Sequence, residues 1–263
     1  MNKVTTDILL TNNIHIYATA EAASIKVARV IADEIIKKRS LGQQLVLGLA
    51  TGNTPKIVYQ ELVRMHREEG LSFQNVISFN LDEYYPLKET HPLSYHSFMN
   101  QHLFDHIDIA QSNIHLPHGE WDVARLGDYC KAYDQKIKQH GGIDLQLLGI
   151  GRNGHIGFNE PGSAFDSATR LIDLHEQTRT DAAIDFEGIE NVPLQAITMG
   201  IATITNAKKI LLLAIGTRKA EIIKKAFQNE VSPEVPATFL RTLPQVAYIL
   251  DQEAAALVGP LER

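Results

Sequence analysis

The stretch "QLVLGLATGNTP", residues 44–55, joins an unbroken apolar run to a short polar turn. Three further apolar runs have the same form, "VISFN" at 76–80, "LQLLGI" at 145–150 and "ILLLAI" at 210–215. A short run that is nearly continuous in apolar residues, rather than alternating, is typical of a strand covered on both faces of a parallel sheet. The four runs therefore predict neighbouring elements of such a sheet.

Amphipathic segments lie between these runs. Apolar residues at helical spacing predict helices over 20–39, 55–70, 123–142 and 217–228. The alternation of strands and helices predicts an α/β fold, a Rossmann-like parallel sheet with helices on both faces. Because the sequence contains no fixed-period repeat, low-complexity tract or linker, we expect residues 1–263 to form a single domain.

Composition narrows the classes of function. The 263 residues are 44% hydrophobic and 21% charged, as in a soluble globular protein, and the net charge of −6 with no long basic run argues against nucleic acid as a partner. The single cysteine, Cys130, excludes an internal disulfide and a cysteine-based metal cluster, and we expect a buried, inert thiol. No apolar run approaches the roughly 20 residues that span a membrane. Since residues 1–19 also lack the apolar core of a signal peptide, we expect a cytoplasmic protein without a membrane partner.

A polar loop follows each predicted strand: "TGNTP", "LDEYYPL", "GRNGHIGFNEP" and "GTRKAE". In open parallel sheets, ligands bind at the carboxyl ends of the strands. We therefore expect the four loops to converge on one site at that edge of the sheet.

The loop "GIGRNGHIGFNEPG", residues 149–162, begins with the dinucleotide fingerprint G-x-G-x-x-G. A dinucleotide site needs a helix that begins within the glycine motif, and Gly157 and Pro161 disfavour one here. We reject the dinucleotide interpretation and expect a tight loop that presents three polar side chains, Asn153, His155 and Glu160.

Two of the loops carry groups suited to proton transfer. His155 has the side chain best matched to that task near neutral pH, and Glu160 could orient the imidazole; a core histidine with a satisfied hydrogen bond is the alternative. In "LDEYY", the neighbouring side chains of Asp82 and Glu83 diverge if the segment is extended, so one of them should face the site as a general base. A solvated acidic loop is equally compatible with that segment.

The other two loops could hold an anion. The turn "TGNTP" lacks the G-K-[ST] of a Walker loop. Its small residues precede a predicted helix, where N–H groups and hydroxyls can bind a phosphate. The candidate residues are Thr51, Gly52, Asn53 and Thr54. Thr54 before Pro55 also fits a helix N-cap. Lys219 could add a positive charge, although an isolated lysine near the start of a helix is more often simply exposed.

Eleven histidines raise the question of a metal. His102 and His106 have the i, i+4 spacing of a helical zinc pair, but the glutamate of H-E-x-x-H is absent. We therefore expect a solvated helix face there and no metal ligands.

Six motifs in this order resemble those of the glucosamine-6-phosphate deaminase family over most of the chain: "LGLATGNTP", "FNLDEYYPL", "SYHSFM", "LLGIGRNGHIGFNEPGS", "ITMGI" and "PATFL". The related 6-phosphogluconolactonases share the fold and a similar histidine loop but lack "FNEP". The resemblance implies a cofactor-free enzyme of amino-sugar catabolism that converts glucosamine 6-phosphate and water to fructose 6-phosphate and ammonia. It leaves a homo-oligomer open, since members of the family range from monomers to hexamers.

The resemblance also implies roles for individual residues. Asp82 would be the base that moves a proton between C2 and C1, and His155, helped by Glu160, would open the sugar ring. Asn153 stands where many members have aspartate, and we expect it to orient His155 by hydrogen bonding without balancing its charge. The phosphate would be held by Thr51, Gly52, Asn53, Thr54 and Lys219.

Some positions depart from the family pattern. Ile184 occupies the place of a lid arginine that reaches the substrate phosphate, and Arg179 aligns with a different lid arginine. Arg170 matches part of the second phosphate site of allosteric members, but Ile172 replaces a lysine there. We therefore predict no activation by an N-acetylated sugar phosphate.

Three alternatives stay open at this point. Galactosamine 6-phosphate could be the substrate, because "GRNGH" and "NEPG" also occur in that related group, although "FNLDEYY" favours the gluco enzyme. A lactonase would use the histidine to activate water and would not need Asp82. A sugar-phosphate-binding protein without turnover is weakly supported by the missing lid arginine.

Overall fold

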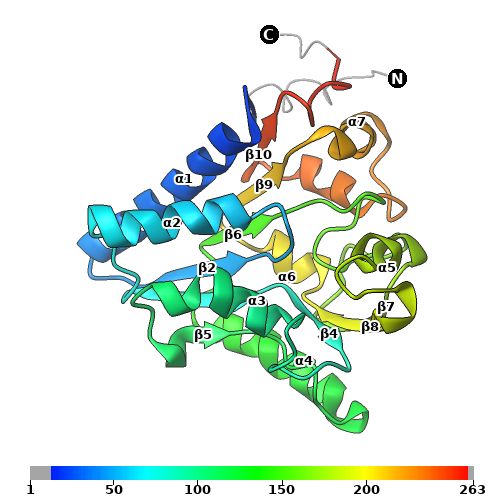
Figure 1. Ribbon diagram of the computed structural model, residues 1–263, viewed down its shortest axis with the longest axis horizontal. Helices are drawn as coiled ribbons and strands as arrows, with labels where there is room; N and C mark the ends of the chain where they lie inside the picture. The colour runs from blue at the N-terminus through cyan, green and yellow to red at the C-terminus, as the bar shows by residue number, and fades with distance from the viewer. Residues whose placement is uncertain (1–12, 260–263) are drawn as a thin grey trace, which may run out of the picture.

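The computed structural model of the protein describes residues 13–259. Its centre is a seven-stranded sheet in the order β1-β10-β9-β6-β2-β3-β5, in which every pair is parallel (Figure 1). The strands are β1 (Ile14–Tyr17), β2 (Leu45–Leu49), β3 (Val76–Asn80), β5 (Ile114–His115), β6 (Leu145–Leu148), β9 (Ile210–Ala214) and β10 (Val246–Asp251). The four predicted strands are confirmed, and as β9, β6, β2 and β3 they lie side by side.

The four predicted helices are also present, as α1 (Ala20–Ser40), α2 (Lys56–Glu69), α4 (Val123–Gln139) and α7 (Ala220–Gln228). Shorter helices are α3 (Tyr95–His102), α5 (Glu176–Ala182) and α6 (Ile201–Thr205), and 3₁₀ turns lie at Phe104–His106, Gln111–Asn113, Ile189–Asn191, Thr217–Lys219 and Pro236–Thr242. Helix α2 ends at Gly70 in the left-handed conformation, as expected. Its first turn receives no side-chain cap, so the N-cap role predicted for Thr54 is wrong.

Alternate residues of each central strand enter different hydrophobic clusters, which explains why the runs are nearly continuous in apolar residues. Leu45, Leu47 and Leu49 pack with α1 and α2 on one face, whereas Val46 of the same strand belongs to the cluster on the other face, with α7. Successive side chains of a strand point to opposite sides, so a strand covered on both faces is apolar at most positions. The buried polar exceptions in these four strands are Ser78, Asn80 and Gln146. The predicted α/β class, with helices on both faces, is therefore confirmed.

A second, smaller sheet is antiparallel and has the order β4-β8-β7, with β4 at Asp82–Tyr85, β8 at Gln195–Thr198 and β7 at Arg170–Asp173. The segment after β3 was predicted as a polar loop, and that prediction is wrong, since β4 begins there. Leu81 connects the two sheets: its N–H donates to Leu49 O (3.1 Å) and its carbonyl accepts from Met199 N (2.7 Å).

Two further expectations concern single features of the chain. Cys130 is buried beside Leu126 and Ile197, as predicted. Among residues 13–259, no helix combines the length and apolar character that crossing a bilayer requires. The signal-peptide prediction concerns residues 1–19, and residues 1–12 lie outside the described part of the chain.

Gly200 precedes α6 and provides a test of the packing between this turn and the segment before β7. A Cβ built on Gly200 would lie 1.9 Å from the carbonyl oxygen of Ser167, which accepts a hydrogen bond from Ala202 N. We expect Gly200→Ala to lower the free energy of unfolding by about 1–3 kcal/mol, because backbone has to move to relieve the clash. Denaturant titration measures the change.

The matched control is Gly127→Ala in the middle of α4, where a Cβ meets nothing within 4 Å. That substitution should raise the free energy of unfolding by up to about 1 kcal/mol, through helix propensity. Equal effects of the two substitutions would contradict the packing described for Gly200.

Candidate active site

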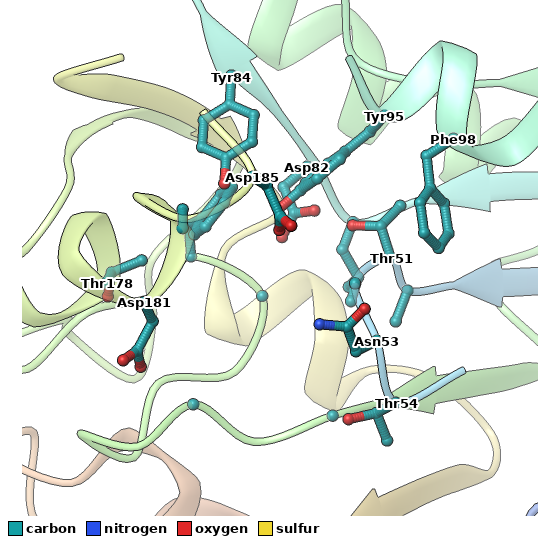
Figure 2. Close-up of a pocket in the computed structure, with 18 of the residues that line it drawn as sticks. Thr51, Asn53, Thr54, Asp82, Tyr84, Tyr95, Phe98, Thr178, Asp181 and Asp185 are labelled. Atoms are coloured by element: carbon teal, nitrogen blue, oxygen red, sulfur yellow. The ribbon is translucent and has the colours of Figure 1, made fainter. Parts of the chain in front are cut away.

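A cavity of about 510 Å³ lies at the carboxyl edge of the central strands. All four loops predicted to converge there contribute to its lining, with Thr51, Gly52, Asn53, Thr54, Asp82, Gly149, Gly151, His155 and Lys219. Figure 2 shows the turn after β2 on one side of the cavity and the side chains of α5 on the other. The sheet therefore brings together segments that are far apart in the sequence.

Asp82 and Glu83 begin β4, and their side chains diverge as the sequence predicted. Asp82 is 5% exposed and lines the cavity, whereas Glu83 is fully buried and points away from it. The Glu83 carboxylate accepts hydrogen bonds from the N–H groups of Tyr84, Tyr95 and His96 and lies 3.0 Å from His96 Nδ1. Only the first of the two acids is free to meet a ligand in the cavity.

Burial, with the neighbouring charge of Glu83 as a second cause, raises the pKa of Asp82 to about 8. Both causes disfavour the charged form of a carboxyl group. A general base works best when its pKa lies near the working pH, and a carboxyl in water is far too acidic for that. The position of Asp82 thus turns an ordinary aspartate into a group that can take up and return a proton near neutral pH.

The loop after β6 forms no helix through residue 162, in agreement with the rejection of a dinucleotide site. Its glycines instead make room for an imidazole. A Cβ on Gly151 would lie 2.2 Å from His155 Cε1, so the ring packs directly over the glycine backbone. The Gly151 N–H donates to His155 O (2.9 Å), which closes the loop and holds the ring at the cavity.

Glu160 lies beside the His155 ring, with 3.4 Å between Oε2 and Nδ1. Burial opposes its ionisation, but hydrogen bonding and the charge of His155, with hydrogen bonds from Thr178 and Asn153, lower the pKa of Glu160 to about 2. Glu160 therefore stays charged where Asp82 tends to be neutral. Two carboxyl groups with oppositely shifted pKa values at one site are the pattern of separate acid–base roles.

The structure corrects the expectation for Asn153. Its Oδ1 accepts from the backbone N–H of His155 (3.2 Å) and its Nδ2 donates to Glu160 Oε2 (2.7 Å), so it makes no hydrogen bond to the imidazole. The ring meets Glu160 and Thr178 Oγ1 (3.3 Å) instead. Asn153 thus positions the carboxylate that in turn orients the ring.

Positively charged side chains also line the cavity. Lys219 is partly buried rather than simply exposed: its Nζ donates to Ile150 O (2.6 Å), and burial lowers its pKa. Lys56, at the first position of α2, and Arg152 also line the cavity. Cations and the N-terminus of a helix around small residues form an environment suited to a phosphate.

The segment after β7 supplies one wall of the cavity through Thr178, Asp181 and Asp185 (Figure 2). Ile184, at the expected lid-arginine position, is 84% exposed and is not among the lining residues. Arg179 donates to Ile189 O (2.7 Å) and does not line the cavity either. The arginine that does line it is Arg152, paired with Asp181 at 2.8 Å.

Aromatic rings also line the cavity, and the sequence did not predict them: Tyr84, Tyr95, Phe98, Phe158 and Phe186. Tyr95 and Phe98 belong to the motif "SYHSFM", whose spacing alone does not indicate that these rings face a cavity.

His102, predicted to lie on a solvated helix face, also lines the cavity, with its ring 4.4 Å from that of Phe98 between centroids. The prediction for His102 is therefore wrong. His106 lies beyond the end of α3 and bonds to Gln101 O (2.9 Å) instead. The two histidines do not form the helical pair that a zinc site would need.

Comparison with known proteins places this geometry in a family. The family model described as "Glucosamine-6-phosphate isomerases/6-phosphogluconolactonase" matches residues 18–248. The chain belongs to this family. The matched range contains every residue predicted for the site.

Several similar relatives are named glucosamine-6-phosphate deaminase. Glucosamine-6-phosphate deaminase of Geobacillus sp. (strain WCH70) is 49% identical over 94% of this chain and 96% of its own length. Glucosamine-6-phosphate deaminase 1 of Bacillus subtilis (strain 168) is 46% identical over 91% and 96%, respectively. The predicted resemblance is confirmed by these proteins.

Solved structures agree with the fold. The structure of a monomeric glucosamine-6-phosphate deaminase superposes on this one with a TM-score of 0.89 at 45% sequence identity. The match covers 93% of this chain and 99% of that protein's chain. A 6-phosphogluconolactonase from Trypanosoma brucei has a TM-score of 0.73 at 22% identity over 93% of this chain and 97% of its own, so it shares the fold. Both groups named in the family description thus have this architecture.

The raised pKa of Asp82 predicts a pH dependence of stability. Between the ordinary value of 3.8 and about 8, the folded protein keeps a proton on Asp82 that the unfolded chain releases, so this contribution to stability is lost as the pH rises through 8. Wild type should lose this stability between pH 5 and pH 9, whereas Asp82→Asn, which has no carboxyl at this position, should not. We therefore expect the free energy of unfolding of the variant minus that of wild type to rise by about 2–4 kcal/mol from pH 5 to pH 9. Denaturant titrations at several pH values measure it.

The exposed Asp33 in α1 supplies the control, Asp33→Asn. Its difference from wild type should stay nearly constant over the same range. A constant difference for Asp82→Asn as well would show that the Asp82 carboxyl titrates normally.

Proposed function

We propose that this protein is a glucosamine-6-phosphate deaminase, which converts glucosamine 6-phosphate and water to fructose 6-phosphate and ammonia. The observation that supports it most is that the buried carboxyl of Asp82, the imidazole of His155 and the small-residue turn 51–54 line one cavity, with Glu160 beside the His155 ring. The relatives of similar length that carry this name support the same assignment.

Binding of the phosphate would fix the sugar in the cavity. The N–H groups and hydroxyls of residues 51–54 and the ammonium of Lys219 are the proposed donors, and these residues line the cavity, as does Arg152. Because phosphate is remote from C1 and C2, its binding orients the reacting carbons without taking part in the chemistry.

Ring opening requires a proton to move between the anomeric hydroxyl and the ring oxygen. We assign this transfer to His155, whose ring lines the cavity and meets the charged Glu160 on its other side. The carboxylate stabilises the imidazolium when His155 holds the proton, and Asn153 keeps the carboxylate in place.

Asp82 would then act on the open-chain aldehyde. Its carboxylate removes the proton from C2 while the C1 oxygen gains one, which gives an enolamine. Return of the proton to C1 leaves an imine at C2, water adds to that carbon, and ammonia departs to leave the ketone of fructose 6-phosphate. A base beside C1 and C2 suffices for this transfer, and the buried Asp82 has the pKa that it needs.

A substrate comparison tests the proposal against its alternatives. Purified protein is supplied separately with glucosamine 6-phosphate, galactosamine 6-phosphate and 6-phosphogluconolactone, and ammonia, ketose phosphate and acid are followed. Ammonia and fructose 6-phosphate from the first substrate support the proposal. Turnover of only one of the other two would replace it with the corresponding activity, and binding without turnover would indicate a sensor.

Asp82→Asn should lower kcat for ammonia release by about 10²–10⁴-fold, since the amide cannot accept the C2 proton. The substrate dissociation constant, measured by calorimetry, should change little because the phosphate contacts remain. Asp33→Asn is the control and should keep wild-type kcat. Near-normal turnover by Asp82→Asn would exclude Asp82 as the base.

Lys219→Ala should act mainly on binding. Loss of a charged donor to phosphate corresponds to about 1.5–3 kcal/mol, or a rise in KM of about 10–150-fold. Lys225→Ala removes an exposed lysine from α7, the helix that follows Lys219, and should leave KM unchanged. An unchanged KM for Lys219→Ala would remove this residue from the phosphate site.

A further inference from the structure

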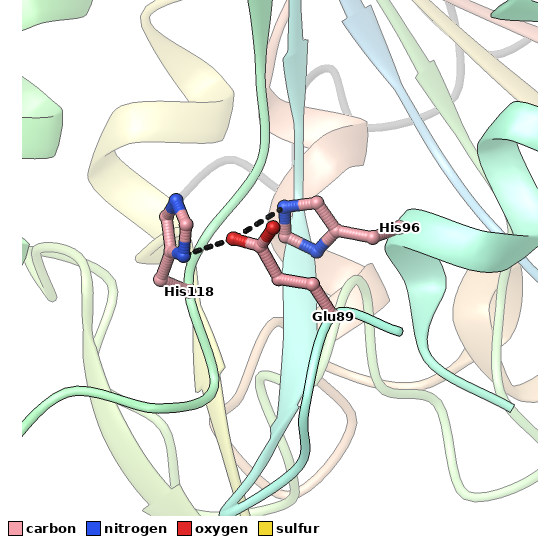
Figure 3. Close-up of side chains that lie close together, drawn as sticks. All are labelled: Glu89, His96 and His118. Atoms are coloured by element: carbon pink, nitrogen blue, oxygen red, sulfur yellow. Dashed lines mark ion pairs between the residues drawn. The ribbon is translucent and has the colours of Figure 1, made fainter. Parts of the chain in front are cut away.

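Three side chains that do not line the cavity meet beside β4. Glu89 belongs to the segment 86–94, His96 to the first turn of α3 and His118 to the segment 116–122 (Figure 3). One potential ligand atom from each lies within 4.8 Å of the other two. Glu89 Oε1 is 3.5 Å from His96 Nε2 and contacts His118 Nδ1.

The orientation of His96 is set from the opposite side of its ring. Its Nδ1 lies 3.0 Å from Oε2 of the fully buried Glu83. An ionised carboxylate can only accept hydrogen bonds, so it places a proton on Nδ1 and leaves the Nε2 lone pair free in the neutral ring. A carboxylate behind an imidazole is the arrangement that orients histidine ligands in metal sites.

The free lone pair of His96 faces an oxygen that lacks a hydrogen bond. Glu89 Oε1 is buried, and although it contacts His118 as an ion pair, no hydrogen bond of proper geometry reaches it from the described residues. An imidazole lone pair and a carboxylate oxygen repel each other unless a proton or a cation lies between them. The half-exposed His118 ring leaves a path for an ion from solvent.

We propose that Glu89, His96 and His118 bind a divalent transition-metal ion of the Zn²⁺ class. Two imidazole nitrogens and one carboxylate oxygen are a donor set that Zn²⁺ uses, with water at the fourth position. The harder ions Mg²⁺ and Ca²⁺ prefer sites made of oxygen atoms alone. Glu83 completes the site from behind by holding the His96 ring.

The bound ion would join two segments that come from different crossovers of the fold. The segment 86–94 ends at Ser94 and is followed by Tyr95, and both residues line the cavity. The ion would therefore hold this part of the cavity wall against the segment 116–122. It would act on stability and positioning, because none of its three ligands lines the cavity. The proposal does not depend on the identity of the substrate.

Calorimetric titration of chelator-treated protein with Zn²⁺ tests the site. We expect saturable binding of one ion per chain, together with changes in the ring ¹⁵N shifts of His96 and His118 in NMR spectra. Mg²⁺ should not bind there. Absence of saturable binding would overturn the proposal and leave a protonated histidine–glutamate cluster, and equal binding of Mg²⁺ would contradict the nitrogen donors.

Ligand variants locate the ion. His118→Asn and Glu89→Gln should each weaken Zn²⁺ binding by at least about 10–100-fold, since loss of even a supporting group behind a ligand has that effect. His15→Asn removes an exposed histidine far along the chain from the cluster and should bind like wild type. Unfolding curves without metal identify a variant that fails to fold, and unchanged affinity in both folded ligand variants would overturn the assignment.

Discussion

Two adjacent carboxyl groups on one extended segment determine how this site is built. An extended chain sends the side chains of Asp82 and Glu83 to opposite sides, and the burial of both makes each dependent on its surroundings. Glu83 is stabilised by three backbone N–H groups and His96, which fixes the start of α3 against β4. Among residues 13–259, no N–H group donates to the Asp82 carboxyl in this way, and burial disfavours its charged form.

The His155 loop has the opposite electrostatic character. Glu160 is also buried, yet Asn153, Thr178 and the imidazole surround it with donors, and its pKa falls where that of Asp82 rises. The same type of group thus has opposite tendencies at the two positions: Glu160 is held in its charged form beside His155, and Asp82 tends to keep its proton. Glycine at 151 is what allows the ring to come close enough to join this arrangement.

The sequence predicted the central sheet well because a strand covered on both faces is apolar at nearly every position, and such short runs alternate here with amphipathic segments. It also predicted that Thr51, Asp82, His155 and Lys219 would meet, since the topology of a parallel sheet carries the ends of its strands to one edge. The family resemblance added roles that spacing alone left open.

Features that depend on long-range pairing were not predictable in the same way. The strand β4 has a polar start and pairs with β8, more than a hundred residues later in the chain, so local pattern indicated a loop. The contact between Asn153 and Glu160 and the aromatic lining depend on side-chain packing that no spacing rule encodes. The histidines that meet at Glu89 come from separate segments, whereas helical spacing relates only His102 and His106, which do not meet in this way.

The backbone of Leu81 has one further consequence. Its N–H is bonded to β2 and its carbonyl to Met199, next to the end of β8, so the residue before Asp82 is clamped between two sheets. The floor of the cavity cannot shift without breaking hydrogen bonds to both. Any movement that admits a ligand is therefore expected in the wall that α5 supplies, because the seven residues of α5 lie outside either sheet.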